Sequence, residues 1–161
     1  MTKQQVQQRV LQNGKPLDLD KFEWDEKTNT FSSEEDYLVI DFSDISYCTF
    51  DTGSYCTFDT SSDCTFDTGF SCTFDTGSYC TFKTGPYCTF HTSSDCTFKT
   101  GEQCVVVRRD VYEVIELEEN KEIRLNEYGK KGFTYIDDDE VEKAIKLLEE
   151  KGRIKKGKII T

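Results

Sequence analysis

The chain has 161 residues, 32% of them charged, and carries a net charge of −11 at neutral pH. This length fits one domain, or a repeat domain with small flanking segments. The excess of acidic residues is spread along the chain, which makes direct binding to nucleic-acid phosphates unlikely. No apolar run approaches the ~18 residues of a membrane span, and residues 1–13 lack a secretory signal pattern. We therefore expect no membrane association and no signal-directed export.

Residues 1–39 are predicted to form an N-terminal β-hairpin cap. Residues 2–12 fit a short helix or a strand equally well, and Asn13-Gly14 is a typical hairpin turn. Further on, Phe22 and Trp24 alternate with charged residues, which favours a second hairpin that returns at Phe31. We expect Trp24 to pack over the first coil of the domain that follows. A ligand-stacking platform is the alternative role for this side chain.

The centre of the sequence is an octapeptide array that begins at Cys48 and ends at Cys104. Its units are CTFDTGSY, CTFDTSSD, CTFDTGFS, CTFDTGSY, CTFKTGPY, CTFHTSSD and CTFKTGEQ. A fixed short period of this kind is typical of solenoids. In each unit, Cys-Thr-Phe alternates in polarity, so Cys and Phe share one face of a strand and Thr points the other way. The following Thr-Gly-Ser is turn chemistry, in which glycine would supply a positive φ. We predict a strand of about five residues, residues 47–51 in the first unit, and then a three-residue corner.

The number of units per coil follows from chain dimensions. At ~3.3 Å per residue, eight residues give a perimeter of only ~26 Å, whereas facing sheets lie ~10 Å apart. Two units give ~53 Å, and three would give a triangular coil. The two TSSDC corners lie 32 residues apart, which favours two faces, but the two GSY corners lie 24 apart, which favours three. We predict a mainly β fold, a short β-solenoid (β-helix) with two units per coil, and three as the alternative.

The predicted core consists of inward columns of phenyl rings and thiols. Each buried aromatic ring removes a large apolar area from water, of the order of 150–250 Å². We expect the cysteines to be free thiols that act as small core residues, ahead of disulfides between coils and, last, a metal site. The columns contain Cys48, Phe50, Cys56, Phe58, Cys64, Phe66, Cys72, Phe74, Cys80, Phe82, Cys88, Phe90, Cys96, Phe98 and Cys104.

The solenoid is predicted to cover residues 40–111, with atypical units at both ends because terminal repeats cap such folds. We place Ile40 and Phe42 in the Cys and Phe register, so that residues 40–47 form a degenerate first unit. Residues 112–161 are predicted to form a C-terminal cap of strands plus a helix. Its elements are a strand at 111–117, a return strand through Ile123 and Leu125, a strand at 132–136, a helix opened by Asp137-Asp138-Asp139 and ended by Gly152, and a final strand over 153–160. We expect the three aspartates to cap the helix rather than bind a metal, and the final lysines to form a solvated face rather than a nucleic-acid patch.

The array resembles the CTFxTGxx octapeptide repeats of uncharacterised bacteriophage and gut-bacterial proteins. The likeness extends into both flanks, through LDLDKFEWDEKTNTFSSEEDYLVIDF and CVVVRRDVYEVIEL. It implies the fold and a viral or bacterial source. Since no signal pattern is found, we expect the chain in the cytoplasm or in a phage particle. It implies no reaction.

Two outward columns are the candidate interaction residues. They are Thr49, Thr57, Thr65, Thr73, Thr81, Thr89 and Thr97, and the residues two places on, Asp51, Asp59, Asp67, Asp75, Lys83, His91 and Lys99. With two faces, Asp51 and Asp67 share a face with Lys83 and Lys99. Carboxylates stacked at ~4.8 Å repel one another unless a cation or partner sits there.

The sequence contains no Ser-His-Asp grouping, no Gly-rich phosphate loop and no paired metal ligands, so we predict no catalytic residues, metal or cofactor. We expect a non-catalytic structural or interaction module that contacts a protein partner or further copies of itself. The alternative is an acidic DNA mimic that inhibits a nucleic-acid enzyme. Ice binding by the threonine column and calcium binding are remoter alternatives, because the Thr-x-Thr pairs and the GGxGxDxUx motif that those functions use are absent.

Overall fold

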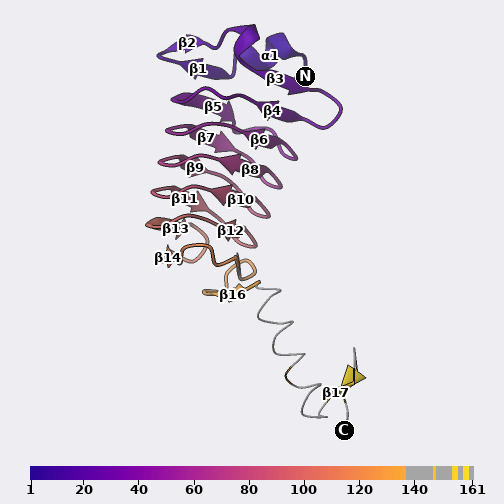
Figure 1. Cartoon of the computed structure of the whole chain (residues 1–161), viewed down its shortest axis with the longest axis vertical. Coiled ribbons are helices and arrows are strands. Elements are labelled where there is room, and N and C mark those ends of the chain that lie inside the picture. The colour runs from indigo at the N-terminus through magenta and orange to yellow at the C-terminus, as the bar shows by residue number, and fades with distance from the viewer. Residues whose placement is uncertain (137–146, 148–153, 156–157, 160–161) are drawn as a thin grey trace.

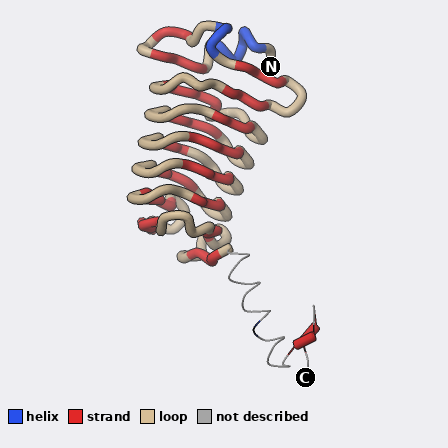
Figure 2. The backbone as a smooth tube through the Cα atoms, viewed as in Figure 1, coloured by secondary structure: helices blue, strands red, loops and turns tan. Residues whose placement is uncertain are grey.

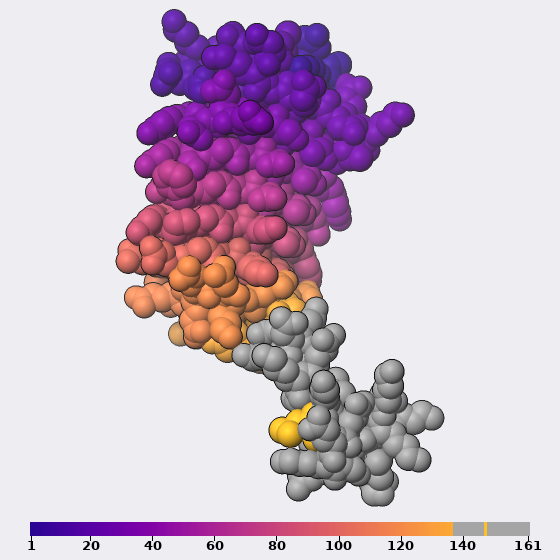
Figure 3. All heavy atoms as spheres, in the orientation of Figure 1, coloured from indigo at the N-terminus to yellow at the C-terminus, as the bar shows by residue number. Residues whose placement is uncertain are grey.

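A computed structural model describes residues 1–136, 147, 154–155 and 158–159. The chain winds into a two-faced β-solenoid in which coils of 16 residues stack along one axis, about five turns in all (Figure 1). Strands alternate with loops around every coil (Figure 2), and successive coils are in contact along the rod (Figure 3). The prediction of a mainly β solenoid with two units per coil is therefore confirmed.

Consecutive octads alternate between two sheets of eight strands each. Sheet A has the order β14-β13-β11-β9-β7-β5-β1-β2, and sheet B has the order β16-β15-β12-β10-β8-β6-β4-β3. Within the array the strands are parallel, and strand phenylalanines 16 residues apart lie opposite one another, as Phe50 and Phe66 do. The strands of sheet A within and beside the array are β5 (Leu38–Phe42), β7 (Thr57–Thr60), β9 (Thr73–Asp75), β11 (Thr89–Thr92) and β13 (Cys104–Arg108). Those of sheet B are β4 (Thr30–Ser32), β6 (Thr49–Asp51), β8 (Thr65–Thr68), β10 (Thr81–Thr84) and β12 (Thr97–Lys99).

The core is a double ladder of phenyl rings. Rings on the same sheet stack face to face, with Phe66 and Phe82 4.9 Å apart and 4° from parallel. Rings on opposite sheets meet edge to face, as Phe66 and Phe74 do at 5.1 Å and 77°. Both arrangements suit the ring quadrupole, if the stacked pairs are offset. The phenylalanine of every Cys-Thr-Phe triplet and all the cysteines of the array are buried, and all eight cysteines are free thiols, as predicted.

A third inward column was missed by the sequence analysis. The second threonine of most units points into the coil beside the corner, where Thr76 and Thr92 are almost fully buried. The hydroxyl of Thr76 donates to the Gly77 carbonyl at 3.4 Å, and five equivalent threonines make the same bond to the next residue. Residues 1, 3 and 5 of each octad therefore face inward, because the extended backbone continues two residues beyond the phenylalanine.

The corners differ from the prediction in the residue that adopts positive φ. The corner glycines have no positive φ; the residue before each cysteine does, as for Tyr55 at 57° and Ser71 at 55°. This left-handed residue turns its N–H along the axis, so that Tyr55 donates to the Phe70 carbonyl of the next coil. The predicted strand start at residue 47 is wrong for the same reason, since β6 begins at Thr49. Glycine is needed for close approach instead, because a Cβ on Gly69 would lie 2.1 Å from Ser54 Oγ and 3.1 Å from the Gly53 carbonyl carbon.

The N-terminal end is closed by antiparallel elements. They are α1 (Lys3–Gln7), β1 (Val10–Gln12), β2 (Lys15–Pro16), the 3-10 turn η1 (Leu19–Lys21) and β3 (Glu23–Asp25). Both predicted hairpins are present, as β1-β2 and β3-β4, and Thr2 and Gln5 form a capping box on α1. Trp24 packs on Phe42 at 6.0 Å and donates its indole N–H to the Met1 carbonyl, which confirms its packing role.

The predicted register of the first unit is wrong by two residues. Ile40 pairs with Phe58 and Leu38 lies one position before Val39, the partner of Thr57, so Ile40 occupies the Phe position and Leu38 the Cys position. Phe42 lies opposite Thr60 and packs edge to face on Phe50. The corner between Phe42 and Cys48 is therefore two residues longer than in the array, a length that the octad period alone does not indicate.

The C-terminal end is closed by β14 (Glu113–Leu117), β15 (Ile123–Leu125) and β16 (Phe133–Tyr135). The segment through Ile123 is not a return strand beside β14, because β14 joins sheet A and β15 joins sheet B. Below the last coil, the fully buried Arg108 donates to both carboxylate oxygens of Asp110 and to the carbonyls of Glu127 and Lys130. Its guanidinium thus holds the loop that crosses the open end of the coil.

The predicted helix from Asp137 to Gly152 lies outside the described residues, apart from Leu147. The predicted final strand is instead a pair of short antiparallel strands, β17 (Ile154–Lys155) and β18 (Lys158–Ile159). Among the described residues, no helix has the length and apolar character needed to cross a membrane.

Truncating a central ring tests the double ladder. Phe66 contacts rings on both sheets, so Phe66→Ala is expected to lower the free energy of unfolding by about 3–5 kcal/mol. Thr65→Ser changes an outward side chain and is the matched control, expected to leave stability nearly unchanged. Chemical denaturation of both variants checks this, and the reverse order of stabilities would contradict the inward assignment.

Two substitutions in one corner test where positive φ is required. Gly69→Ala is expected to lower the melting temperature, because its methyl group would overlap the corner of the preceding coil. Ser71→Gly is expected to be tolerated or to stabilise slightly, since glycine adopts the left-handed conformation without the Cβ penalty. A larger loss for Ser71→Gly than for Gly69→Ala in thermal unfolding would show that the corner is assigned incorrectly.

Candidate functional site: the outward faces and edges

The predicted outward columns all point away from the core, but they divide between two faces. Sheet B carries Thr49, Thr65, Thr81 and Thr97 with Asp51, Asp67, Lys83 and Lys99. Sheet A carries Thr57, Thr73 and Thr89 with Asp59, Asp75 and His91. Each strand thus presents one threonine and one charged or imidazole side chain. Pairs of outward threonines do not occur in the array, because the second threonine of each octad lies on the inward side.

The charge on sheet B changes sign halfway along the rod. Asp51 lies beside Asp67, Asp67 beside Lys83, and Lys83 beside Lys99 in successive strands. The predicted grouping of like charges on one face is therefore confirmed. Only the Asp67–Lys83 step places opposite charges on neighbouring strands, so the N-terminal half of this face is acidic and the C-terminal half is basic.

Sheet A carries three aspartates on successive strands, because the corrected register adds Asp41 to the column of Asp59 and Asp75. Partial burial, together with the charges of Asp75 and Asp41, raises the pKa of Asp59. Hydrogen bonds from Ser43 instead lower the pKa of Asp41. Asp75 has its own cationic partner, since Arg109 forms an ion pair with it and also donates to the Thr76 carbonyl. The central carboxylate, Asp59, is thus the one that repulsion affects most.

The two edges of the rod differ in composition, which the sequence analysis did not consider. Edge 1 contains the corners that lead from sheet B to sheet A, residues 33–37, 52–55, 68–71, 84–87 and 100–103. Edge 2 contains the opposite corners, residues 43–47, 61–63, 77–79 and 93–95. Edge 1 carries an aromatic stripe of Tyr37, Tyr55, Phe70 and Tyr87, each between 43% and 59% exposed. The 16-residue spacing of corner residues on one edge is the sequence signal that would have revealed this stripe, once two faces were known.

The first three rings of the aromatic stripe are in contact. Tyr37 stacks on Tyr55 with centroids 4.8 Å apart and planes 7° from parallel, and Phe70 meets Tyr55 edge to face at 5.2 Å. The hydroxyl of Tyr87 donates to Glu102 on the next coil. Exposed and mutually packed rings of this kind are uncommon on monomer surfaces and mark interaction sites.

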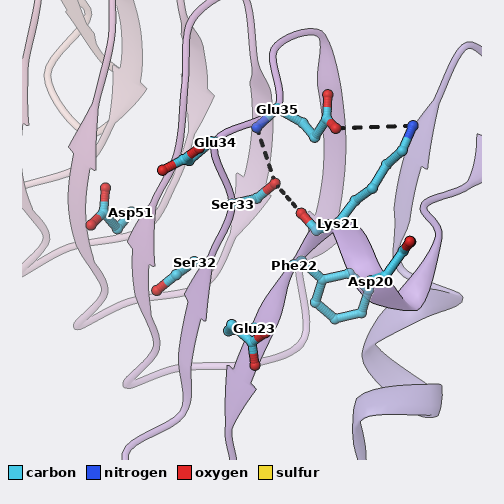
Figure 4. Close-up of a pocket in the computed structure, with 9 residues that line it drawn as sticks. All are labelled: Asp20, Lys21, Phe22, Glu23, Ser32, Ser33, Glu34, Glu35 and Asp51. Atoms are coloured by element: carbon cyan, nitrogen blue, oxygen red, sulfur yellow. Dashed lines mark hydrogen bonds and ion pairs between the residues drawn. The ribbon is translucent and has the colours of Figure 1, made fainter.

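An acidic hollow of about 590 Å³ lies at the N-terminal end of sheet B beside edge 1 (Figure 4). It is lined by Asp20, Lys21, Phe22, Glu23, Ser32, Ser33, Glu34, Glu35 and Asp51. Ser33 fixes its wall, since its hydroxyl donates to the Lys21 carbonyl and accepts from the Glu35 N–H. Lys21 is the only basic residue in the lining and lies 3.9 Å from Glu35, so carboxylates dominate the charge of the hollow.

The cysteines are enclosed in the core. The pKa of the Cys72 and Cys80 thiols lies above the usual range. Each thiol forms hydrogen bonds with cysteines of the neighbouring coils, and burial disfavours a thiolate. In the part of the chain that the structure describes, no group of three or more His, Cys, Asp or Glu side chains is arranged to hold a metal ion.

Comparisons with protein family models, with curated proteins and with solved structures found no match. By its geometry the molecule is a two-faced β-solenoid. The charge on sheet B changes sign once along the rod, sheet A carries an aspartate column, and edge 1 carries the aromatic stripe.

Neutralising Asp59 is expected to stabilise the fold. A carboxyl whose pKa is raised in the folded state makes stability fall as the pH rises from its ordinary pKa through the raised value. Asp59→Asn should therefore raise the melting temperature at pH 7, and the difference from wild type should disappear below about pH 3. Because the side chain is exposed to solvent, high salt should reduce the gain.

Asp67→Asn is the matched control for this prediction. Its carboxylate lies next to Lys83 as well as next to Asp51, so no comparable gain is expected. Melting curves of both variants between pH 2.5 and 8 make the comparison, and a lower melting temperature for Asp59→Asn at pH 7 would contradict it.

Proposed function

We propose that this chain is a non-catalytic, rigid β-solenoid that serves as a structural or interaction module, with a protein partner or further copies of itself as its ligand. The observation that carries the proposal is the register of the two sheets. This register repeats the same outward positions on successive coils. The core beneath them is rigid because its phenyl rings pack against rings of both sheets. Such a surface is extended and pre-organised, which lowers the conformational entropy lost on binding.

The setting that we propose rests on the resemblance of the octapeptide array to bacteriophage and gut-bacterial repeat proteins. We place the module in a phage particle or in the bacterial cytoplasm, as an accessory or structural component. A rod with distinct faces and a distinct aromatic edge suits this role, because it can contact several neighbours in a fixed orientation.

A second candidate function is inhibition of a nucleic-acid enzyme by an acidic surface that imitates DNA. The aspartates of sheet A and the acidic N-terminal half of sheet B favour it, because they place carboxylates at regular intervals on two faces. Lys83 and Lys99 oppose it, since they interrupt the acidic column on sheet B.

Cross-linking in the source cells, followed by mass spectrometry of purified particles and lysate, separates these functions. The structural role predicts that the chain is cross-linked to copies of itself or to particle proteins, and that Asp51→Asn/Asp67→Asn has little effect on this. The DNA-mimic role predicts salt-sensitive capture of a nucleic-acid enzyme that the same double variant weakens. A chain that stays monomeric and forms no cross-links, both in purified particles and in the lysate, would contradict the proposal.

A further inference from the structure

At one corner position of edge 1, successive coils carry Ser54, Phe70, Pro86 and Glu102, and only Phe70 places an exposed aromatic ring there. In the corner of the preceding coil, Ser54 is buried and its hydroxyl accepts the Phe70 N–H at 3.1 Å. Phe70 occupies the equivalent position one coil later, yet its ring lies on the surface and is 43% exposed. A phenyl ring in water is unfavourable, and the solenoid does not need it, because serine fits the same position in the coil before. This ring, Tyr37 and Tyr55 therefore form an apolar surface that the fold itself does not require.

The aromatic stripe and the acidic hollow form one continuous surface. The corner that bears Tyr37 also bears Glu34 and Glu35, which line the hollow. This corner lies directly on the next one, since Asp36 accepts the Ser54 N–H at 2.7 Å and the Tyr37 N–H donates to the Ser54 carbonyl. We call Tyr37, Tyr55, Phe70 and the hollow together the acidic-aromatic patch. Its composition suits a ligand that combines cationic and apolar side chains.

The chain itself contains a segment of that chemistry. Residues 151–161, KGRIKKGKIIT, carry five lysines and arginines, three isoleucines and no acidic residue. The rest of this strongly acidic chain has no comparable stretch. The isoleucines match the exposed rings, and the basic side chains match the carboxylates of the hollow.

We propose that the acidic-aromatic patch of one copy binds the segment 151–161 of a second copy, so that copies associate end to end. The inference rests on the proposed role as an interaction module and names its partner. The patch runs along edge 1 from the end of the rod that carries α1 to the corner between β8 and β9, whereas the chain leaves the solenoid through β16 at the opposite end (Figure 1). A contact between different surfaces at opposite ends does not close on itself as a two-fold dimer does, so it generates linear oligomers.

The repeat supplies substitutions that preserve the corners. Phe70→Ser introduces the residue that the preceding coil has at the equivalent position, Ser54. Tyr55→Ser introduces the residue that the next coil has at the equivalent position, Ser71, and φ is positive at both Tyr55 and Ser71. The double variant Tyr55→Ser/Phe70→Ser should therefore fold and lose the apolar part of the patch. Tyr79→Ser removes an exposed ring from edge 2 and is the matched control.

Sedimentation velocity of the full-length chain over a hundredfold concentration range tests the proposal. Wild type and Tyr79→Ser should form oligomers whose size grows with concentration, and 0.5 M salt should reverse the association. A labelled synthetic peptide of residues 151–161 should bind the full-length chain in a fluorescence anisotropy titration. Tyr55→Ser/Phe70→Ser should weaken that binding at least tenfold, and Glu34→Gln should weaken it less.

Three outcomes would overturn the inference. They are a wild type that stays monomeric throughout, peptide affinity equal for the double variant and Tyr79→Ser, and concentration-independent docking of the segment on its own chain. None of them excludes the proposed function, because cross-linking to a different protein would still support an interaction module. If the peptide binds as expected but no cross-linked partner or copy is found in cells, the surface assignment stands and the proposed function fails.

Discussion

The stacking of phenyl rings across and along the solenoid is the interaction on which the rest of the structure depends. One octad exposes its apolar face to water, and two octads enclose only a thin slab, so each coil is stable only against its neighbours. The phenyl rings connect each coil to its neighbours, because they stack face to face within a sheet and meet edge to face between sheets. The small thiols and the inward threonines fill the space that remains near the corners.

This core sets narrow rules for the corners. Sixteen residues close a coil only if each corner reverses the chain within a few residues. Each corner must also pack closely on the corner of the next coil. The left-handed residue before each cysteine meets the first requirement, and glycines such as Gly69 meet the second by leaving no side chain between coils. The corner position that holds the buried Ser54 in one coil holds the exposed Phe70 in the next, so this position accepts side chains of different size. Variation of this kind can give an otherwise uniform rod a surface for a partner.

The two ends of the rod are finished in the same way by unrelated sequences. Antiparallel strands cover the last parallel rung of each sheet, with β1 and β3 at one end and β14 and β15 at the other. Reversal of direction ends the parallel ladder and takes up its free backbone groups. The buried Arg108 strengthens the C-terminal end, since one guanidinium donates to the carboxylate of Asp110 and to two backbone carbonyls.

By itself, the sequence determined the solenoid, the inward Cys and Phe columns, the free thiols and both N-terminal hairpins, because these depend on local alternation and turn chemistry that repeat every eight residues. Only the tertiary structure decided that coils contain two octads, since the repeats supported 16- and 24-residue coils alike. It also decided the register of Ile40 and the left-handed residue of each corner, because both depend on how one coil fits the next. The aromatic stripe emerged for the same reason: its members are 15 to 18 residues apart in the chain and become neighbours only when the coil closes.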